Sequence, residues 1–140
     1  MSVRSTSVRS ITGASPTDPS AGVVPAGTNV VIVRGLLRRV PQFRVLPSGD
    51  ELLSCDVTVR SDSGPAETIP VVWLQPTAAA GRLAEADEVV VIGRVRRRFF
   101  RAAGATASRT EVCADRIIPV RSVARVRTAV GSALCEIDLA

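Results

Sequence analysis

The sequence predicts a small all-β domain with five strands and one short helix between the third and the fourth strand. Three observations predict it: β-branched and apolar residues recur in short runs, turn residues separate the runs, and only one stretch is rich enough in alanine for a helix. A chain of 140 residues with 46% hydrophobic residues can form a single core with short tails. We therefore expect one domain, residues 28–120, between an N-terminal tail, residues 1–27, and a C-terminal extension, residues 121–140.

The tail is rich in Ser, Thr, Pro and Gly and has few charges, so we expect it to be flexible and to bury little surface. The first strand is predicted over Asn29 to Leu37, where β-branched residues dominate and Gly35 marks a bulge or a sharp bend. Residues 42–46 lie between two prolines and lead into Glu51 to Arg60, where apolar and polar residues alternate. Residues 42–46 thus form a turn-bounded segment before the second strand, and Asn29 to Leu37 and Glu51 to Arg60 fit best as two antiparallel strands.

The middle of the chain predicts a third strand followed by a helix. Glu67 to Leu74 returns to a β pattern, and Pro70, which has no N–H to donate, places this strand at an edge or a bulge. Pro76 to Asp87 is the only segment that predicts a helix, because alanines fill it and Thr77 can cap its start.

The last two predicted strands are Val89 to Phe100, the longest, and Arg109 to Val120, with a turn of small residues at Ala102 to Ser108 between them. The predicted order is therefore three strands, one helix and two strands. This is the layout of the OB-fold, a partly open barrel that binds oligonucleotides across one face.

Positive charge is concentrated in the run from Gly93 to Arg101, which holds five arginines, two phenylalanines and no acidic residue. All eighteen basic residues of the chain are arginines, and the net charge of +5 favours an anionic partner. Arginine attracts phosphate at long range while an exposed ring stacks on a base, which is the combination that single strands of nucleic acid require.

Alternation along the strand predicts how these side chains are oriented. If Val89, Val91, Gly93 and Val95 point into the core, then the outward face is shared by Arg94, Arg96, Arg98 and Phe100. Arg97 has the opposite parity and cannot lie in an apolar core, so we expect a bulge or the rim of the barrel near it. The alternative is a solvated strand whose arginines serve solubility, but two adjacent phenylalanines favour a surface that something covers.

The few aromatic rings each carry information. Phe100 is the ring that we predict to contact bases. Trp73, at the end of the third strand, is either a stacking platform at the groove or a core residue, and Phe43 is assigned more to packing than to bases. The chain has one tryptophan and three phenylalanines in all.

Several residue types are missing. Histidine and tyrosine do not occur, which removes the commonest general base, the commonest metal ligand and the phenolic acid. The three cysteines have no CxxC spacing, and their odd number argues against a disulfide framework. We therefore expect no catalytic activity, no cofactor and no metal. No apolar stretch has the length of a signal peptide or a membrane span, so we expect a cytoplasmic, nucleoid-associated protein.

The sequence resembles the bacterial single-stranded DNA-binding proteins in four segments that follow the family's order. The likeness is strongest in the last segment, where a glycine, a basic strand, an aromatic ring, a glycine turn and Thr-Glu-Val succeed one another. The four segments are Asn29 to Leu37; Pro41 to Gly49; Ile69 to Leu74 with the following Arg82-Leu83-Ala84; and Gly93 to Arg101 with Gly104 and Arg109-Thr110-Glu111-Val112.

The resemblance implies sequence-independent binding and protection of single-stranded DNA in replication, recombination or repair, by OB domains that assemble as homotetramers. It implies that Phe100 stacks on a base, that Arg96 and Arg98 line the DNA path and that Trp73 is a second platform. Further candidates for phosphate contacts are Arg34, Arg38, Arg39 and Arg44, and the basic run adds Arg94 and Arg101.

The sequence departs from the family at two places. The loop at residues 61–65 has no aromatic ring where relatives often place one, and Cys135 to Ala140 does not form a long linker with a strongly acidic tip. We therefore expect a secondary paralogue that does not recruit replication or repair enzymes in the usual way. The alternative function is an OB-like assembly module that binds a protein partner or RNA, with its binding of single-stranded DNA weakened or lost.

Overall fold

The computed structural model describes residues 24–137, so the expected N-terminal tail lies outside the described residues as far as position 23. Strands dominate this part of the chain, and the all-β class is confirmed. The elements are β1 (Val31–Leu37), β2 (Gln42–Val45), β3 (Glu51–Val59), β4 (Glu67–Leu74), the 3-10 helix η2 (Ala78–Arg82), β5 (Glu88–Ala102), β6 (Ala105–Pro119) and the α-helix α2 (Val123–Cys135).

All six strands form one sheet in the order β1-β5-β6-β4-β3-β2, and a further pairing between β1 and β3 closes the sheet into a ring. β1 and β2 lie end to end along the same edge of β3, where residues 36–37 and 42–45 find their partners. The predicted number of five strands is therefore corrected to six. β4 contacts β6 over only two residues, Val71 and Val72, so Pro70 lies on a free edge, as its missing N–H predicts.

The main core fills the interior of the ring. The residues that are fully buried there come from β1, β3, β4 and β5 and are Leu37, Leu53, Val57, Val71, Val89 and Val91. A second apolar cluster lies outside the ring, where α2 covers part of β5 and β6. Because the first half of β5 is covered on both faces, it reads in the sequence as a continuous apolar run.

Two glycines stand where neighbouring strands come closest. A Cβ atom on Gly35 would overlap the carbonyl oxygen of Thr58, so β1 can cross β3 and close the ring only with glycine there. A Cβ atom on Gly93 would overlap the backbone of Cys113, beside a β-bulge that shifts the register between β5 and β6. The bulge expected near Arg97 thus lies earlier, at Gly93, where β5 leaves the ring.

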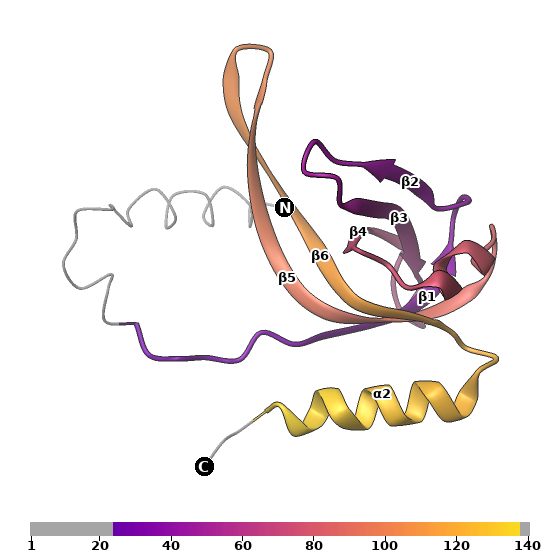
Figure 1. Cartoon of the computed structure of the whole chain (residues 1–140). Helices are drawn as coiled ribbons and strands as arrows, with labels where there is room; N and C mark the ends of the chain where they lie inside the picture. The colour runs from indigo at the N-terminus through magenta and orange to yellow at the C-terminus, as the bar shows by residue number, and fades with distance from the viewer. Residues whose placement is uncertain (1–23, 138–140) are drawn as a thin grey trace.

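β5 and β6 continue past the ring as a curved two-stranded arm, residues 94–111 (Figure 1). Pairing of β5 with β1 ends at Gly93, and β6 meets β4 only after the arm. The arm closes in a tight turn at Ala103 and Gly104, with φ of 52° and 80°. The predicted turn was too long, since β6 begins at Ala105. Val95, predicted to point into the core, is 44% exposed because the strand has already left the ring.

The helices differ from the prediction. Between β4 and β5 the chain forms only η2, five residues long, and Thr77 precedes it without a side-chain capping hydrogen bond. Within residues 24–137 the one α-helix is α2, which lies in the predicted C-terminal extension and packs on the sheet through Val126, Ala129 and Ala133. These residues recur with helical spacing. Neither helix in residues 24–137 is long and apolar enough to cross a membrane.

Candidate functional site

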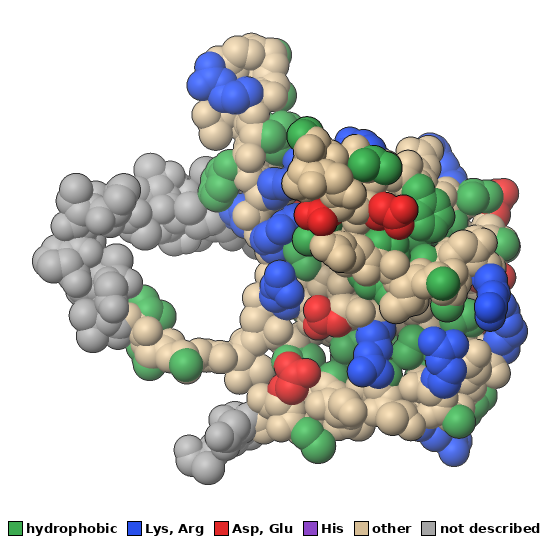
Figure 2. Space-filling model, in the orientation of Figure 1, with side chains coloured by type: hydrophobic (Ala, Val, Ile, Leu, Met, Phe, Trp, Pro, Cys, Tyr) green, Lys and Arg blue, Asp and Glu red, His purple; other side chains and the backbone are tan. Residues whose placement is uncertain are grey.

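An open groove of about 770 Å³ lies between the arm and the outer side of β2, β3 and β4. Its floor combines the aliphatic side chains of Leu52, Val72 and Leu74 with the polar side chains of Ser54 and Asp56. Six arginines line it together with only three carboxylates, Asp56, Glu111 and Asp115, so the groove has three positive charges in excess. The six are Arg39 and Arg44 near β2, Arg94, Arg96 and Arg98 on β5, and Arg109 on β6. On the face seen in Figure 2, basic side chains gather along the arm.

The row of arginines on β5 follows from strand geometry. Arg94, Arg96 and Arg98 occupy alternate positions, so their side chains share one face, as predicted. Antiparallel pairing sets Arg98 opposite Arg109 and Arg96 opposite Glu111 on the neighbouring strand. The same face therefore presents a double row of charged side chains along the length of the groove.

The buried side chain of Glu111 contacts two of these arginines, Arg96 and Arg98. Its side chain is 2% exposed, and its Oε2 accepts a hydrogen bond of 2.8 Å from Arg96 Nη2 and lies 3.5 Å from Arg98 Nε. This hydrogen bond raises the pKa of Arg96 above its ordinary value. The two arginine side chains remain 47% and 46% exposed. A buried carboxylate thus holds one end of each guanidinium while the remaining donors stay available to a ligand.

Phe100 lies farther out along the same row. The guanidinium carbon of Arg98 is 5.3 Å from the centre of the Phe100 ring, which places both side chains on one side of the arm. Phe100 is 37% exposed. Phe99 is 58% exposed and, by alternation, lies on the opposite face with Val95 and Arg97.

Trp73 is in the core, with 4% of its surface exposed. Of the two alternatives that the sequence leaves open, the structure supports packing, and the role of Trp73 as an open stacking platform is corrected. The cause is strand parity: Trp73 pairs with Leu53, which also points into the ring, whereas Leu74 faces the groove. Phe43, which the sequence assigns more to packing, also pairs with Leu53 and lies on the face of β2 away from Arg44, but it is 52% exposed and is not part of the core.

Three of the predicted arginines are not brought to the groove. Arg34 lies on β1, where its Nε donates a hydrogen bond of 2.8 Å to Glu88. Arg38 is exposed in the connection between β1 and β2, outside the groove lining. Arg101 lies near the tip of the arm, where its Nη2 is 3.4 Å from the Gly104 carbonyl oxygen.

Arg109 and Glu111 belong to the groove but were not predicted as site residues. The signal that would have found them is the register of the arm. Once the turn is placed at Ala103 and Gly104, the residues opposite Arg96 and Arg98 follow directly. The sequence prediction placed a longer turn there, so it could not set that register.

The cysteines show no sign of a metal or redox site. Within residues 24–137, no group of three or more potential metal ligands occurs, and the cysteines Cys55, Cys113 and Cys135 are all free. Burial, with a smaller contribution from Asp56, raises the pKa of Cys55 to about 12. That thiol is therefore protonated and unreactive at neutral pH.

A closed sheet of this topology, with a basic groove beside a long β-hairpin, defines an OB-like all-β fold. The chain is similar in structure to a single-stranded DNA-binding protein of Plasmodium falciparum solved in complex with single-stranded DNA. The TM-score is 0.59 at 14% sequence identity, over 69% of this chain and 97% of that one. No protein-family model and no curated protein matches the sequence. At this identity the likeness concerns the fold.

Proposed function

We propose that this protein is an OB-fold barrel that binds single-stranded DNA along the groove, without sequence preference and without catalysis. The observation that carries the proposal is the row of Arg94, Arg96 and Arg98, two of which a buried Glu111 holds in place. A fold shared with a protein that was solved on single-stranded DNA supports it.

The dimensions of the row suit an extended strand. Alternate residues on a strand are roughly 6.6 Å apart, so successive arginines can meet successive phosphates without bending the protein. The aliphatic part of the floor, Leu52, Val72 and Leu74, offers apolar contact to bases of any kind. Affinity would therefore come mainly from charge, with Phe100 as the exposed ring that stacks.

The same proposal includes a biological setting. We propose that the protein protects single strands in replication, recombination or repair in a bacterial cytoplasm, as a secondary paralogue of its family. A homo-oligomer, a tetramer by the family resemblance, is the proposed assembly. Phe99, on the far face of the arm, is exposed, and this supports an assembly because burying an exposed aromatic ring in an interface is favourable. Light scattering with and without oligonucleotide measures the assembly.

Binding is tested by fluorescence anisotropy with an end-labelled oligo-dT of about 16 nucleotides, at the upper end of the site sizes of single OB-folds. We expect log affinity to fall linearly with log salt, by about 0.7 for each phosphate neutralised. Arg98→Ala removes a groove arginine and should lower that slope. Arg97→Ala is the matched control, because it removes the same charge from the neighbouring residue on the opposite face of the arm.

No binding of oligo-dT at low salt would contradict the proposal, and so would equal losses in the two variants. Oligo-rU of the same length tests the alternative of RNA binding. Tighter binding of oligo-rU than of oligo-dT would favour RNA as the natural partner.

A further inference from the structure

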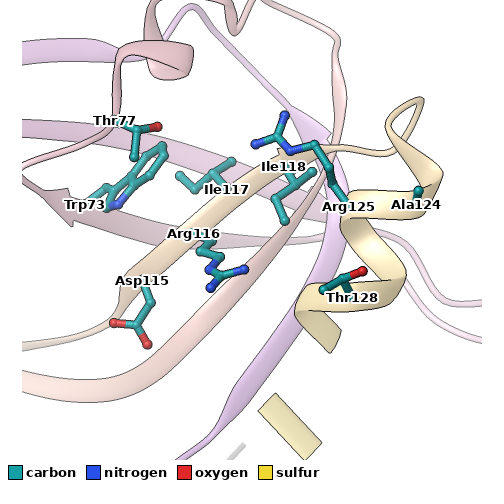
Figure 3. Close-up of a pocket in the computed structure, with 9 residues that line it drawn as sticks. All are labelled: Trp73, Thr77, Asp115, Arg116, Ile117, Ile118, Ala124, Arg125 and Thr128. Atoms are coloured by element: carbon teal, nitrogen blue, oxygen red, sulfur yellow. The ribbon is translucent and has the colours of Figure 1, made fainter. Parts of the chain in front are cut away.

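A second pocket, of about 450 Å³, lies between the start of α2, β6 and the segment that precedes η2 (Figure 3). The groove described above does not include it. α2 contributes Arg125 and Thr128, and Thr77 lies on the opposite side. Figure 3 shows Arg125 reaching from α2 past Ile118 toward the side of Trp73 and Thr77.

The β-bulge between β5 and β6 brings an additional arginine to this pocket. Before the bulge Gly93 pairs with Ala114, and after it Ile92 pairs with Arg116, which leaves Asp115 as the extra residue. If the strands paired regularly, without the bulge, Asp115 would lie opposite Ile92, and Arg116 would lie opposite Val91 and point into the ring. The bulge reverses the parity of β6 and keeps Arg116 on the outer face, on which Ile92 also lies.

The pocket continues the groove. Asp115 lines both of them, and Arg116 stands roughly 6.6 Å, or two strand residues, beyond Arg94 along the β5–β6 pair. Arg116 lies on β6, so the arginine row of the groove continues onto the neighbouring strand. Asp115 itself lies 3.8 Å from Arg94, on the groove side.

The chemistry of the pocket suits a nucleotide. Arg116 and Arg125 form no ion pair within residues 24–137, so both guanidinium groups are available to an anion. The wall beside them is apolar and consists of Ile117, Ile118 and the small exposed part of the Trp73 indole. A volume of about 450 Å³ falls within the range of small-ligand sites.

We propose that this pocket is an additional subsite, in which Arg116 and Arg125 each bind a phosphate of the strand that leaves the groove and the apolar wall between them receives a base. The inference rests on the proposed function and adds α2 to the nucleic-acid path. The site size is accordingly longer than the groove alone provides.

The test compares full-length Arg125→Ala with Arg127→Ala. Both remove one exposed arginine from α2, and only Arg125 lines the pocket. Each variant is titrated with oligo-dT of about 6 and about 16 nucleotides, which bracket the site size of one OB-fold. Trp73 is the only tryptophan, so quenching of its emission reports a base in the pocket.

We expect Arg125→Ala to bind the longer oligonucleotide about threefold to tenfold more weakly than Arg127→Ala does, with a salt slope lower by about 0.7. The shorter oligonucleotide should bind both variants equally. Quenching of Trp73 should require the longer one and be reduced in Arg125→Ala. Equal affinities and equal quenching in the two variants would overturn the subsite while leaving the groove intact. Failure of the unaltered protein to bind either oligonucleotide would instead overturn the proposed function and the subsite with it.

Discussion

The two halves of β5 differ in both their side chains and their surroundings: the first half is aliphatic and covered, whereas the second is rich in arginine and phenylalanine and exposed. In residues 88–93, the valines and Ile92 are covered on one face by the core of the ring and on the other by α2. In residues 94–102, every residue except Arg97 is exposed, and the strand pairs with β6 alone. The first half therefore stabilises the fold, whereas the second half presents its side chains to solvent.

Gly93 and the β-bulge mark the boundary between these halves. β1 begins at Val31, opposite Gly93, and of the β5 residues only Val90 and Ile92 pack in the cluster with α2, so both coverings end here. The bend at Gly93 carries the strand away from both, so that Arg94, Arg96 and Arg98 lie over a groove instead of beneath a helix. One glycine thus separates a structural segment from a binding segment.

The largest contrast is expected in stability. Ile92→Ala should lower the free energy of unfolding by about 2–5 kcal/mol, because the residue is buried between the sheet and α2 and the substitution leaves a cavity. Val95→Ala, three positions later and 44% exposed, should stay within about 0.5 kcal/mol of the unaltered protein. Urea denaturation measures both. Similar losses would show that the arm is as tightly packed as the ring.

A second contrast concerns the boundary. Gly93→Ala places a methyl group against the backbone of Cys113 and Ala114, so we expect a loss of about 1–3 kcal/mol in the free energy of unfolding. Gly131→Ala is the matched control, because its methyl group meets nothing within 4 Å and lies inside α2. Alanine favours the helix, so that variant should gain about 1 kcal/mol. Thermal unfolding should therefore shift in opposite directions, and a shift of the same sign would contradict the close approach at Gly93.

A third contrast separates the two faces of the arm. Phe100→Ala should weaken binding of oligo-dT by about 1–3 kcal/mol if that ring stacks on a base. Phe99→Ala removes a neighbouring and more exposed ring from the opposite face and should leave affinity nearly unchanged. Anisotropy titrations at one salt concentration compare them. A larger effect at Phe99 would assign the far face to the nucleic acid.

Sequence patterns predicted the part of this molecule that depends on alternation. Period-two spacing is enough to place Arg94, Arg96 and Arg98 on one face, and β-branched runs are enough to locate most of the strands. Burial of Trp73 could not be predicted in the same way. Either face of β4 is compatible with its pattern, and the choice depends on pairing with Leu53 across the sheet.

The remaining features depend on contacts between distant segments. Arg109 and Glu111 enter the groove through the register of the arm, which a turn of two residues sets. α2 has helical spacing of its apolar residues, but its stability comes from packing on Val90, Ile92 and Ile118, as is general for short amphipathic helices. Arg34 was predicted from its charge alone, and its ion pair with Glu88 becomes visible only when β1 and β5 are paired.

The thiols provide a pH-dependent contrast between covered and open regions. Cys55 is largely buried and has a pKa of about 12, above its value in the unfolded chain, so its folded form keeps the proton longer. The contribution of this thiol to the free energy of unfolding should be fully present below about pH 9. It should fall between about pH 9 and 12, by at most about 1.4 kcal/mol per pH unit. The chain has no histidine or tyrosine, and its basic residues are all arginine, so few other groups titrate there. Cys55→Ala should reduce the pH dependence of the urea midpoint in this range. Cys135→Ala, at an exposed position, should leave that pH dependence unchanged.

The smallest expected effect lies at the point where the free edge of the arm begins. Asn29 Nδ2 donates a hydrogen bond of 2.8 Å to the Val95 carbonyl oxygen, and the Val95 N–H donates one of 2.9 Å to Asn29 Oδ1. This side chain therefore replaces the backbone partner that β1 no longer provides. Asn29→Ala should cost about 0.5–1 kcal/mol because the bonds are exposed to water.

The sharper readout of Asn29→Ala is hydrogen exchange at the Val95 amide, which should become faster while the Val91 amide, inside the ring, is unaffected. Thr28→Ala, at an exposed neighbouring position, serves as the control. Unchanged exchange at Val95 would mean that the arm holds its shape without the Asn29 contact. Faster exchange confined to the arm would show that the two halves of β5 open independently, as expected if only the first half belongs to the cooperative core.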